Sequence, residues 1–155
     1  MIQDGYKLMK RENFKDWKTP EIQHGQLTQW NWLVQYPDTL KLGKYTDLGA
    51  FTYINAKFGV EIEDFVQVGS HCSIYSESTI DGKSGKVEIK RNARIGSHSL
   101  VMPGVTIGEN TIIGAFSLVN KDVSSNVVAF GVPVEVKRNL SQEEIENMEA
   151  ETEGF

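Results

Sequence analysis

Cysteine, proline and long apolar runs are all scarce in this sequence. The lack of cysteine pairs excludes intrachain disulfides, and the lack of long apolar runs excludes a membrane helix. Cys72 is the only cysteine, so no intrachain disulfide can form and a reducing, cytoplasmic location is expected. No apolar run approaches the ~20 residues of a membrane helix, and the N-terminal MIQDGYKLMKREN lacks a signal-peptide core. The net charge of −5 gives no electrostatic reason to expect nucleic acid. We therefore expect one domain of 155 residues with no membrane or nucleic-acid partner.

A six-residue repeat dominates what is present, and it is clearest from Val87 to Val123. In blocks of six this stretch is VEIKRN, ARIGSH, SLVMPG, VTIGEN, TIIGAF and SLVNKD. The third place of each block is branched and aliphatic: Ile89, Ile95, Val101, Ile107, Ile113 and Val119. This period fits neither a helix face nor a long strand, and it indicates an all-β prism of short strands that turns a corner every block. Because one block cannot bury its apolar residues alone, neighbouring coils must stack.

The first inward line contains one eight-residue step, from Ile54 to Ile62, and a longer interruption follows the line. That line consists of Leu42, Leu48, Ile54, Ile62, Val68 and Ile74. The step from Ile74 to Ile89 is too long for one block, and its surplus is rich in turn-forming residues, so we predict an extruded loop over residues 77–86. A second alignment makes Ile80 a further inward position. The first is preferred because it stacks the similar corners Val68–His71 and Ile95–His98 one coil apart.

Both ends of the chain lack the repeat. The predicted divisions are a non-repeating cap (1–38), a β-helix domain (39–134) and a C-terminal tail (135–155). In the cap we expect a short helix over Tyr6–Trp17 and a strand over Trp30–Val34. The three tryptophans of the cap cover the open end of the prism or a subunit contact, or alternatively line an acceptor pocket. In the tail a helix is expected over Ser141–Glu151, with Ser141 as its N-cap.

The segment PGVTIGENTIIGAFSLVNKDVSSNVVAFGVPVEVKR resembles the closing segment of the maltose and galactoside O-acetyltransferases and of sugar O- and N-acetyltransferases. Together with the repeat, it is similar to the hexapeptide-repeat acyltransferases from about residue 40 to residue 140. The resemblance implies a left-handed parallel β-helix, a homotrimer with sites between subunits, and acetyl-CoA as acyl donor. The left-handed winding rests on the resemblance alone, because the usual rule for parallel crossovers predicts the opposite hand.

The resemblance also implies a coenzyme A slot. Ser97 is at the position where a family member offers a backbone N–H to the thioester oxygen, and Ala115 where a backbone group meets the pantetheine arm. Lys121 and Arg138 are at positions of basic residues near the phosphate end. The predicted cofactor-binding residues are Ser97, Gly114, Ala115, Lys121, Pro133 and Arg138. Glu135 departs from the pattern, because relatives often have a basic residue there.

The proton acceptor is where the sequence departs most from its relatives. The O-acetyltransferases have a catalytic histidine at the position of Thr79, so another base must be found. His98 is the first candidate because it follows Ser97, and His71 and Glu77 are the others; alternatively each is only an exposed corner or surface residue. The predicted acceptor contacts are Tyr53, Asn55, Tyr75 and Thr79. Cys72 occupies an inward first place and is expected to be a small apolar filler, not a nucleophile.

An amine is a better nucleophile toward a thioester than a sugar hydroxyl, so the missing histidine favours an amino-sugar acceptor, free or nucleotide-linked. Three alternatives stay open: a sugar O-acetyltransferase, a non-catalytic trimeric scaffold, and a zinc enzyme like the carbonic anhydrases of this fold. The zinc enzyme is disfavoured because no two histidines have a short ligand spacing, and no metal is expected.

Overall fold

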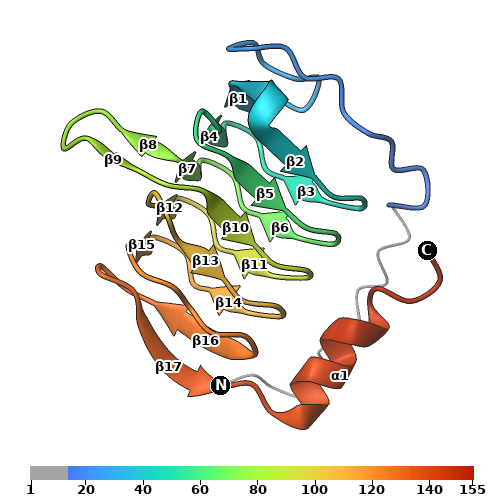
Figure 1. Cartoon of the computed structure of the whole chain (residues 1–155). Helices are drawn as coiled ribbons and strands as arrows, with labels where there is room; N and C mark the ends of the chain where they lie inside the picture. Colours follow the sequence, from blue (N-terminus) through green and yellow to red (C-terminus); the bar gives the residue numbers. More distant parts are fainter. Residues whose placement is uncertain (1–13) are drawn as a thin grey trace.

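The computed structural model describes residues 14–155, which wind into a three-sided parallel β-solenoid (Figure 1). Successive coils contribute short strands to three sheets, which we name A, B and C. Sheet A consists of β1 (Leu33–Gln35), β4 (Tyr53–Asn55), β7 (Ser73–Tyr75), β12 (Leu100–Val101) and β15 (Leu118–Val119). Sheet B consists of β2 (Leu40–Leu42), β5 (Val60–Ile62), β10 (Val87–Ile89) and β13 (Thr106–Ile107). Sheet C consists of β3 (Asp47–Leu48), β6 (Gln67–Val68), β11 (Arg94–Ile95), β14 (Ile112–Ile113), β16 (Val127–Phe130) and β17 (Glu135–Asn139).

Strand pairing confirms the predicted six-residue register. Ile62 pairs with Ile89 and Val68 with Ile95, so equivalent places of neighbouring coils lie directly above one another. The inward third places stack within each of the three sheets and meet in one core along the solenoid axis, and almost all are buried. The isoleucines among them that are fully buried are Ile54, Ile62, Ile74, Ile89, Ile107 and Ile113. The core is therefore built between coils, as a repeat too short to bury itself requires.

Glycine recurs where sheet C turns into sheet A because the next coil lies directly against it. A Cβ on Gly69 would lie 2.5 Å from the Ser97 nitrogen, and a Cβ on Gly96 would lie 2.3 Å from the Ala115 nitrogen. No side chain fits at such distances. The close approach of the backbones, and not a turn conformation, is what requires glycine at these places.

The predicted extruded loop is present as a hairpin. β8 (Glu77–Ser78) and β9 (Lys83–Ser84) pair in antiparallel fashion and project from the solenoid (Figure 1). Ile80 at the tip is 99% exposed, so the alignment that made it an inward position is wrong.

The solenoid begins earlier than predicted. β1 pairs in register with β4, and its Val34 is fully buried, so the strand expected at Trp30–Val34 lies at Leu33–Gln35 and belongs to sheet A. A single strand before the first full block shows no period, which is why the sequence placed it in the cap. The helix predicted over Tyr6–Trp17 falls mostly outside the described residues; at its end Trp17 N–H donates to the Phe14 carbonyl at 3.0 Å in a turn.

The C-terminal end is closed by β16, β17 and the helix α1 (Gln142–Ala150). Ser141 is the N-cap, as predicted: Glu144 N–H donates to Ser141 Oγ at 3.1 Å, and Ser141 N–H donates to Glu144 Oε2 at 2.8 Å. The helix lies along the corner between sheets B and C (Figure 1). There Asn92 Nδ2 donates to Asn110 Oδ1 at 2.8 Å and to the Met148 carbonyl at 3.1 Å. Across residues 14–155, α1 included, we find no helix long and apolar enough to span a bilayer.

Candidate functional site

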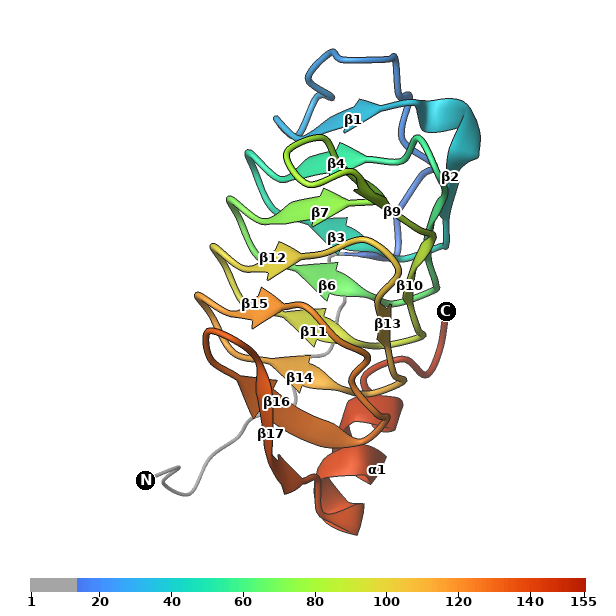
Figure 2. The same ribbon diagram turned by 60° about the vertical axis from the view of Figure 1, so that its left-hand side comes forward.

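The corner between sheets C and A has a column of four aromatic rings on its outside, which we name the ring ladder: Phe51, His71, His98 and Phe116. The His71 and His98 rings are parallel within 6° with centroids 4.8 Å apart, and His98 and Phe116 are also 4.8 Å apart. All four residues have φ between 56° and 63°. This left-handed conformation turns each coil sharply and is more readily adopted by Asn and His than by bulky residues. The stacked corners form one edge of the solenoid, at the left of Figure 2.

Ser97 and Ala115 precede His98 and Phe116 in two neighbouring corners. The amides on either side of Ser97 form hydrogen bonds to neighbouring coils. Gly96 N–H donates to the Ile113 carbonyl at 2.8 Å, and His98 N–H donates to the Ser70 carbonyl at 3.0 Å. Within residues 14–155, the Ser97 and Ala115 N–H groups have no hydrogen-bond acceptor. Two neighbouring corners therefore each have an amide N–H without an acceptor, and one of these amides belongs to the residue before His98. Donors without a partner suit a developing oxyanion.

A cavity of about 590 Å³, which we name the acceptor cavity, lies between the outer face of sheet A and the β8–β9 hairpin. The predicted residues that line it are Tyr53, Asn55, Tyr75, Glu77 and Thr79. Lining residues that were not predicted are Gln35, Tyr36, Lys57, Ser78, Ile80, Leu100 and Met102. Gln35 stacks on the predicted Asn55, one coil away, so stacking the blocks in register could have identified it. In the described part of the chain, no tryptophan lines this cavity.

The acceptor cavity is polar without being strongly charged. Lys57 Nζ donates to Glu77 Oε1 at 2.9 Å, and this hydrogen bond raises the pKa of Lys57. Burial, with a further contribution from Tyr75, raises the pKa of Tyr53, so this phenol is neutral at physiological pH. The Tyr53 and Tyr75 rings lie 5.5 Å apart. A neutral polyol finds donors, acceptors and aromatic surface here.

The structure separates the predicted catalytic residues into two groups. Glu77 lines the acceptor cavity, whereas His71 and His98 lie on the ring ladder, before the sheet A strands. The cavity is lined along the sheet A strands, from Tyr53 and Leu100 at the starts of β4 and β12 to Asn55 and Tyr75 at the ends of β4 and β7. Among the described residues, neither histidine lines it.

The remaining predicted cofactor residues lie toward the C-terminal end of the solenoid. Gly114 N–H donates to the Ala129 carbonyl at 2.9 Å, Lys121 is exposed after β15, and Pro133 follows a cis peptide bond in the turn between β16 and β17. Arg138 on β17 is engaged, because its two terminal nitrogens each donate to Glu144 at 2.8 Å. A phosphate at this place must compete with Glu144 for the guanidinium.

The Glu144 carboxylate predicts a pH dependence of stability. Hydrogen bonds from Arg138 and from the Ser141 amide lower its pKa to about 2. Because the folded-state pKa is depressed, the stabilisation is complete above the ordinary value of about 4.3 and is lost as the pH falls toward 2. We expect Glu144→Gln to lower the melting temperature at pH 7, and the difference from the unmodified protein to shrink between pH 5 and pH 2. Circular dichroism melting checks this. Glu143→Gln, on the same turn, is the control, and an equal pH-dependent loss there would contradict the assignment.

Cys72 is the small apolar filler that was predicted. It is buried, its thiol donates to the Gly96 carbonyl at 3.3 Å, and burial raises its pKa, so it is a poor thiolate nucleophile. Among residues 14–155 there is no group of three or more His, Cys, Asp or Glu residues placed to hold a metal ion.

The repeat and much of the chain around it are similar to known proteins. Residues 86–121 match the family described as Bacterial transferase hexapeptide (six repeats). The chain is 38% identical over 114 residues to the galactoside O-acetyltransferase of Lactococcus lactis subsp. lactis, covering 64% of this chain and 55% of that protein. It is 33% identical over 123 residues to the galactoside O-acetyltransferase of Escherichia coli (strain K12), covering 70% of this chain and 61% of that protein. The chain thus spans less than two thirds of the length of either curated relative.

Solved structures share the architecture over most of the chain. The N-acyltransferase AntD from Bacillus cereus, solved with dTDP and coenzyme A, has a TM-score of 0.67 at 21% sequence identity and covers 80% of this chain and 85% of that one. At this identity the likeness concerns the fold alone.

Proposed function

The chain belongs to the hexapeptide-repeat transferase family, and from this we propose that it transfers an acyl group from acyl-coenzyme A, above all acetyl-CoA, to a sugar. The observation that carries the proposal is the corner at Ser97 and His98, where an amide N–H without an acceptor among the described residues belongs to the residue before an exposed histidine. Acyl transfer from a thioester needs donors for the oxyanion and a proton acceptor. Both are present at one corner, on the outer edge of the solenoid.

A sugar hydroxyl is the acceptor that these relatives support, because the two described above are galactoside O-acetyltransferases. This favours the O-acetyltransferase alternative over the amino-sugar acceptor to which Thr79 pointed. The amino sugar remains the second candidate on one observation: Thr79, which lines the acceptor cavity, cannot serve as the base that a hydroxyl needs.

The proposed steps use residues of this chain. His98 accepts the proton of the acceptor hydroxyl as the hydroxyl oxygen bonds to the thioester carbon. The carbonyl oxygen becomes an oxyanion and accepts a hydrogen bond from the Ser97 N–H. The C–S bond then breaks, and the departing thiolate of coenzyme A takes the proton from His98. The products are a sugar ester and free coenzyme A, so atoms and charge balance.

In our proposal this chemistry uses a second copy of the chain. His98 does not line the acceptor cavity of its own subunit, so the ring ladder of one copy faces the acceptor cavity of the next. The exposed side chains support the ring ladder, and not sheet B, as the contact face. Phe51 and Phe116 on the ring ladder are 57% and 67% exposed in the single chain. A subunit contact would bury this apolar surface. Sheet B, in contrast, presents charged pairs such as Lys86–Glu61 at 2.7 Å, which suit solvent.

We expect the chain to be a homotrimer in solution, because heterologous contacts of this kind close by rotational symmetry. Phe116→Asn keeps a residue that tolerates the left-handed backbone and removes an exposed ring, so it should shift the assembly toward monomers. Light scattering at micromolar concentration measures both states. A stable monomer of the unmodified chain would contradict the shared site.

The coenzyme phosphate is expected to bind Lys121 and Arg138. Replacing both by alanine removes two cations that can pair with phosphate, and acetyl-CoA affinity should fall about tenfold or more, with a smaller loss for the dephospho form. Lys137→Ala is the matched control, since Lys137 is the neighbour of Arg138 on β17 and pairs with Glu135 at 3.2 Å. Isothermal titration calorimetry measures the affinities, and unchanged binding in the double variant would refute the phosphate assignment.

The activity itself is tested by release of free thiol from acetyl-CoA. We expect release with methyl galactoside, which offers only hydroxyls, and a product that is an ester. Release only with the 2-amino analogue would establish the second candidate. Binding of acetyl-CoA without release for any sugar would point to the non-catalytic scaffold, and failure to bind acetyl-CoA would refute the proposal.

A further inference from the structure

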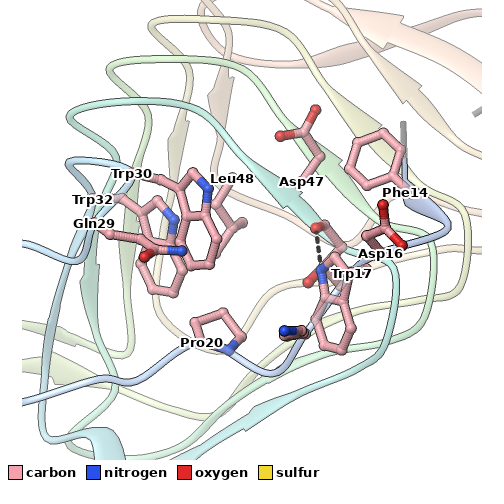
Figure 3. Close-up of a pocket in the computed structure, with 11 residues that line it drawn as sticks. Phe14, Asp16, Trp17, Pro20, Gln29, Trp30, Trp32, Asp47 and Leu48 are labelled. Atoms are coloured by element: carbon pink, nitrogen blue, oxygen red, sulfur yellow. Dashed lines mark hydrogen bonds between the residues drawn. The ribbon is translucent and has the colours of Figure 1, made fainter. Parts of the chain in front are cut away.

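A second cavity, of about 430 Å³, lies at the start of the solenoid, and all three tryptophans of the chain line it (Figure 3). Trp30 and Trp32 lie on one side of it, Trp17 on the other, and Pro20 below. We name it the cap cavity. It shares no lining residue with the acceptor cavity, and the proposed acyl transfer uses none of its residues.

The tryptophans of the cap cavity are held in different ways. Trp17 Nε1 donates to the Thr46 carbonyl at 3.0 Å, which fixes its ring against the first coil. Trp32 is 2% exposed and belongs to the core, so it contributes a rigid wall. Trp30 is 45% exposed. The cavity therefore has two rings fixed by the fold and one large ring surface that is open to a ligand.

A third cavity, of about 390 Å³, adjoins the cap cavity. The two share Lys18, Pro20, Gln29 and Trp30. Trp30 thus lines both, and a ligand can contact its ring from either cavity. The polar side chains of the adjoining cavity are mainly amides and hydroxyls: Gln23, Gln26, Gln29, Thr19 and Thr28. An amide both donates and accepts, so this lining suits a ligand with many groups of both kinds and no net charge.

The aromatic and polar groups that line the two cavities favour a sugar as the ligand. A pyranose ring has C–H faces that pack on an indole, and its hydroxyls donate to carboxylates and exchange hydrogen bonds with amides. The described residues that line the cap cavity include two carboxylates, Asp16 and Asp47, and one ammonium, Lys18. A phosphate or other anion would meet more negative than positive groups here, and a small cation would leave the glutamines of the adjoining cavity unused.

We propose that the cap cavity and its neighbour together bind a neutral oligosaccharide of at least two rings, with consecutive sugars in the two cavities and both in contact with Trp30. The site lies at the first coil, away from the Ser97–His98 corner. It would hold a glycan whether or not that glycan is acylated, so the inference does not depend on the proposed activity.

Intrinsic tryptophan fluorescence tests this directly, because every tryptophan of the chain lines the site. The probes are glucose, galactose and N-acetylglucosamine with disaccharides built from each. We expect at least one disaccharide to change the fluorescence saturably, and its monosaccharide to bind at least about tenfold more weakly because it fills one cavity only. The same titrations by calorimetry give affinities that do not depend on fluorescence.

Trp30→Ala should abolish disaccharide binding while leaving acyl transfer to a small acceptor and the melting temperature nearly unchanged. The matched control is Phe51→Asn, which removes another exposed ring one coil away and should leave saccharide binding intact. The proposal is overturned if no saccharide of the panel binds, if Trp30→Ala binds as the unmodified chain does, or if tetramethylammonium binds more tightly than the disaccharides. If the unmodified chain binds the disaccharide but transfers no acyl group, the proposed function is wrong and the saccharide site stands.

Discussion

His98→Asn should lower kcat for acyl transfer by at least about a hundredfold, since a positioned general base contributes about 10²–10⁴ in rate. Asparagine is the suitable replacement because His98 has φ of 60°, a conformation that Asn92, Asn110 and Asn126 adopt at other corners of this solenoid. Alanine would add backbone strain and confuse a chemical effect with a structural one. Steady-state rates with acetyl-CoA and methyl galactoside give the comparison.

The chain provides a matched control in His71. It has φ of 58°, stacks on His98 at 4.8 Å and is also exposed to solvent, but it follows Ser70 in the coil above and not Ser97. His71→Asn should therefore change kcat by less than about tenfold, well below the effect of a lost base. Equal losses in both variants would mean that the ring ladder, and not one imidazole, is what the reaction needs.

A small effect of His98→Asn would reject His98 as the base. The pH–rate profile then decides between the remaining possibilities. If the profile shifts when the acceptor changes, the acceptor ionises by itself, as an amine can. If the profile is the same for every acceptor but moves in Glu77→Gln, the carboxylate paired with Lys57 is the base.

Ile113→Asp should leave no folded protein in solution. Ile113 is 1% exposed and pairs with Ile95 above and Ala129 below, so a carboxylate there is buried in apolar surroundings without a partner. Ile112→Asp is the control: it is the adjacent residue on β14 but faces outward, so its carboxylate reaches water. That variant should fold and melt close to the unmodified chain.

A milder substitution keeps the prediction measurable. Ile113→Ala should cost about 2–5 kcal/mol of unfolding free energy, the usual range for a truncated core isoleucine. Urea denaturation followed by circular dichroism gives this value. A cooperative Ile113→Asp variant with unchanged melting would mean that the third place of each block does not face the core.

The sequence by itself determined the features that repeat or that depend on near neighbours. The inward column through Ile107 and Ile113, the hairpin between Ile74 and Ile89, and the helix begun by Ser141 were all predictable. In a solenoid each residue takes its environment from the places one block away, so a local period carries the tertiary register. A capping box likewise needs only two residues three places apart.

Only the tertiary structure decided the features that occur once. β1 joined sheet A although no repeat precedes it, Arg138 bound Glu144, and Trp17, Trp30 and Trp32 came together around a cavity at the first coil. It also left both histidines on the ring ladder, outside the lining of the acceptor cavity, which periodicity could not reveal. Such contacts join segments with unrelated environments, and their geometry follows from which surfaces meet once the coils have stacked.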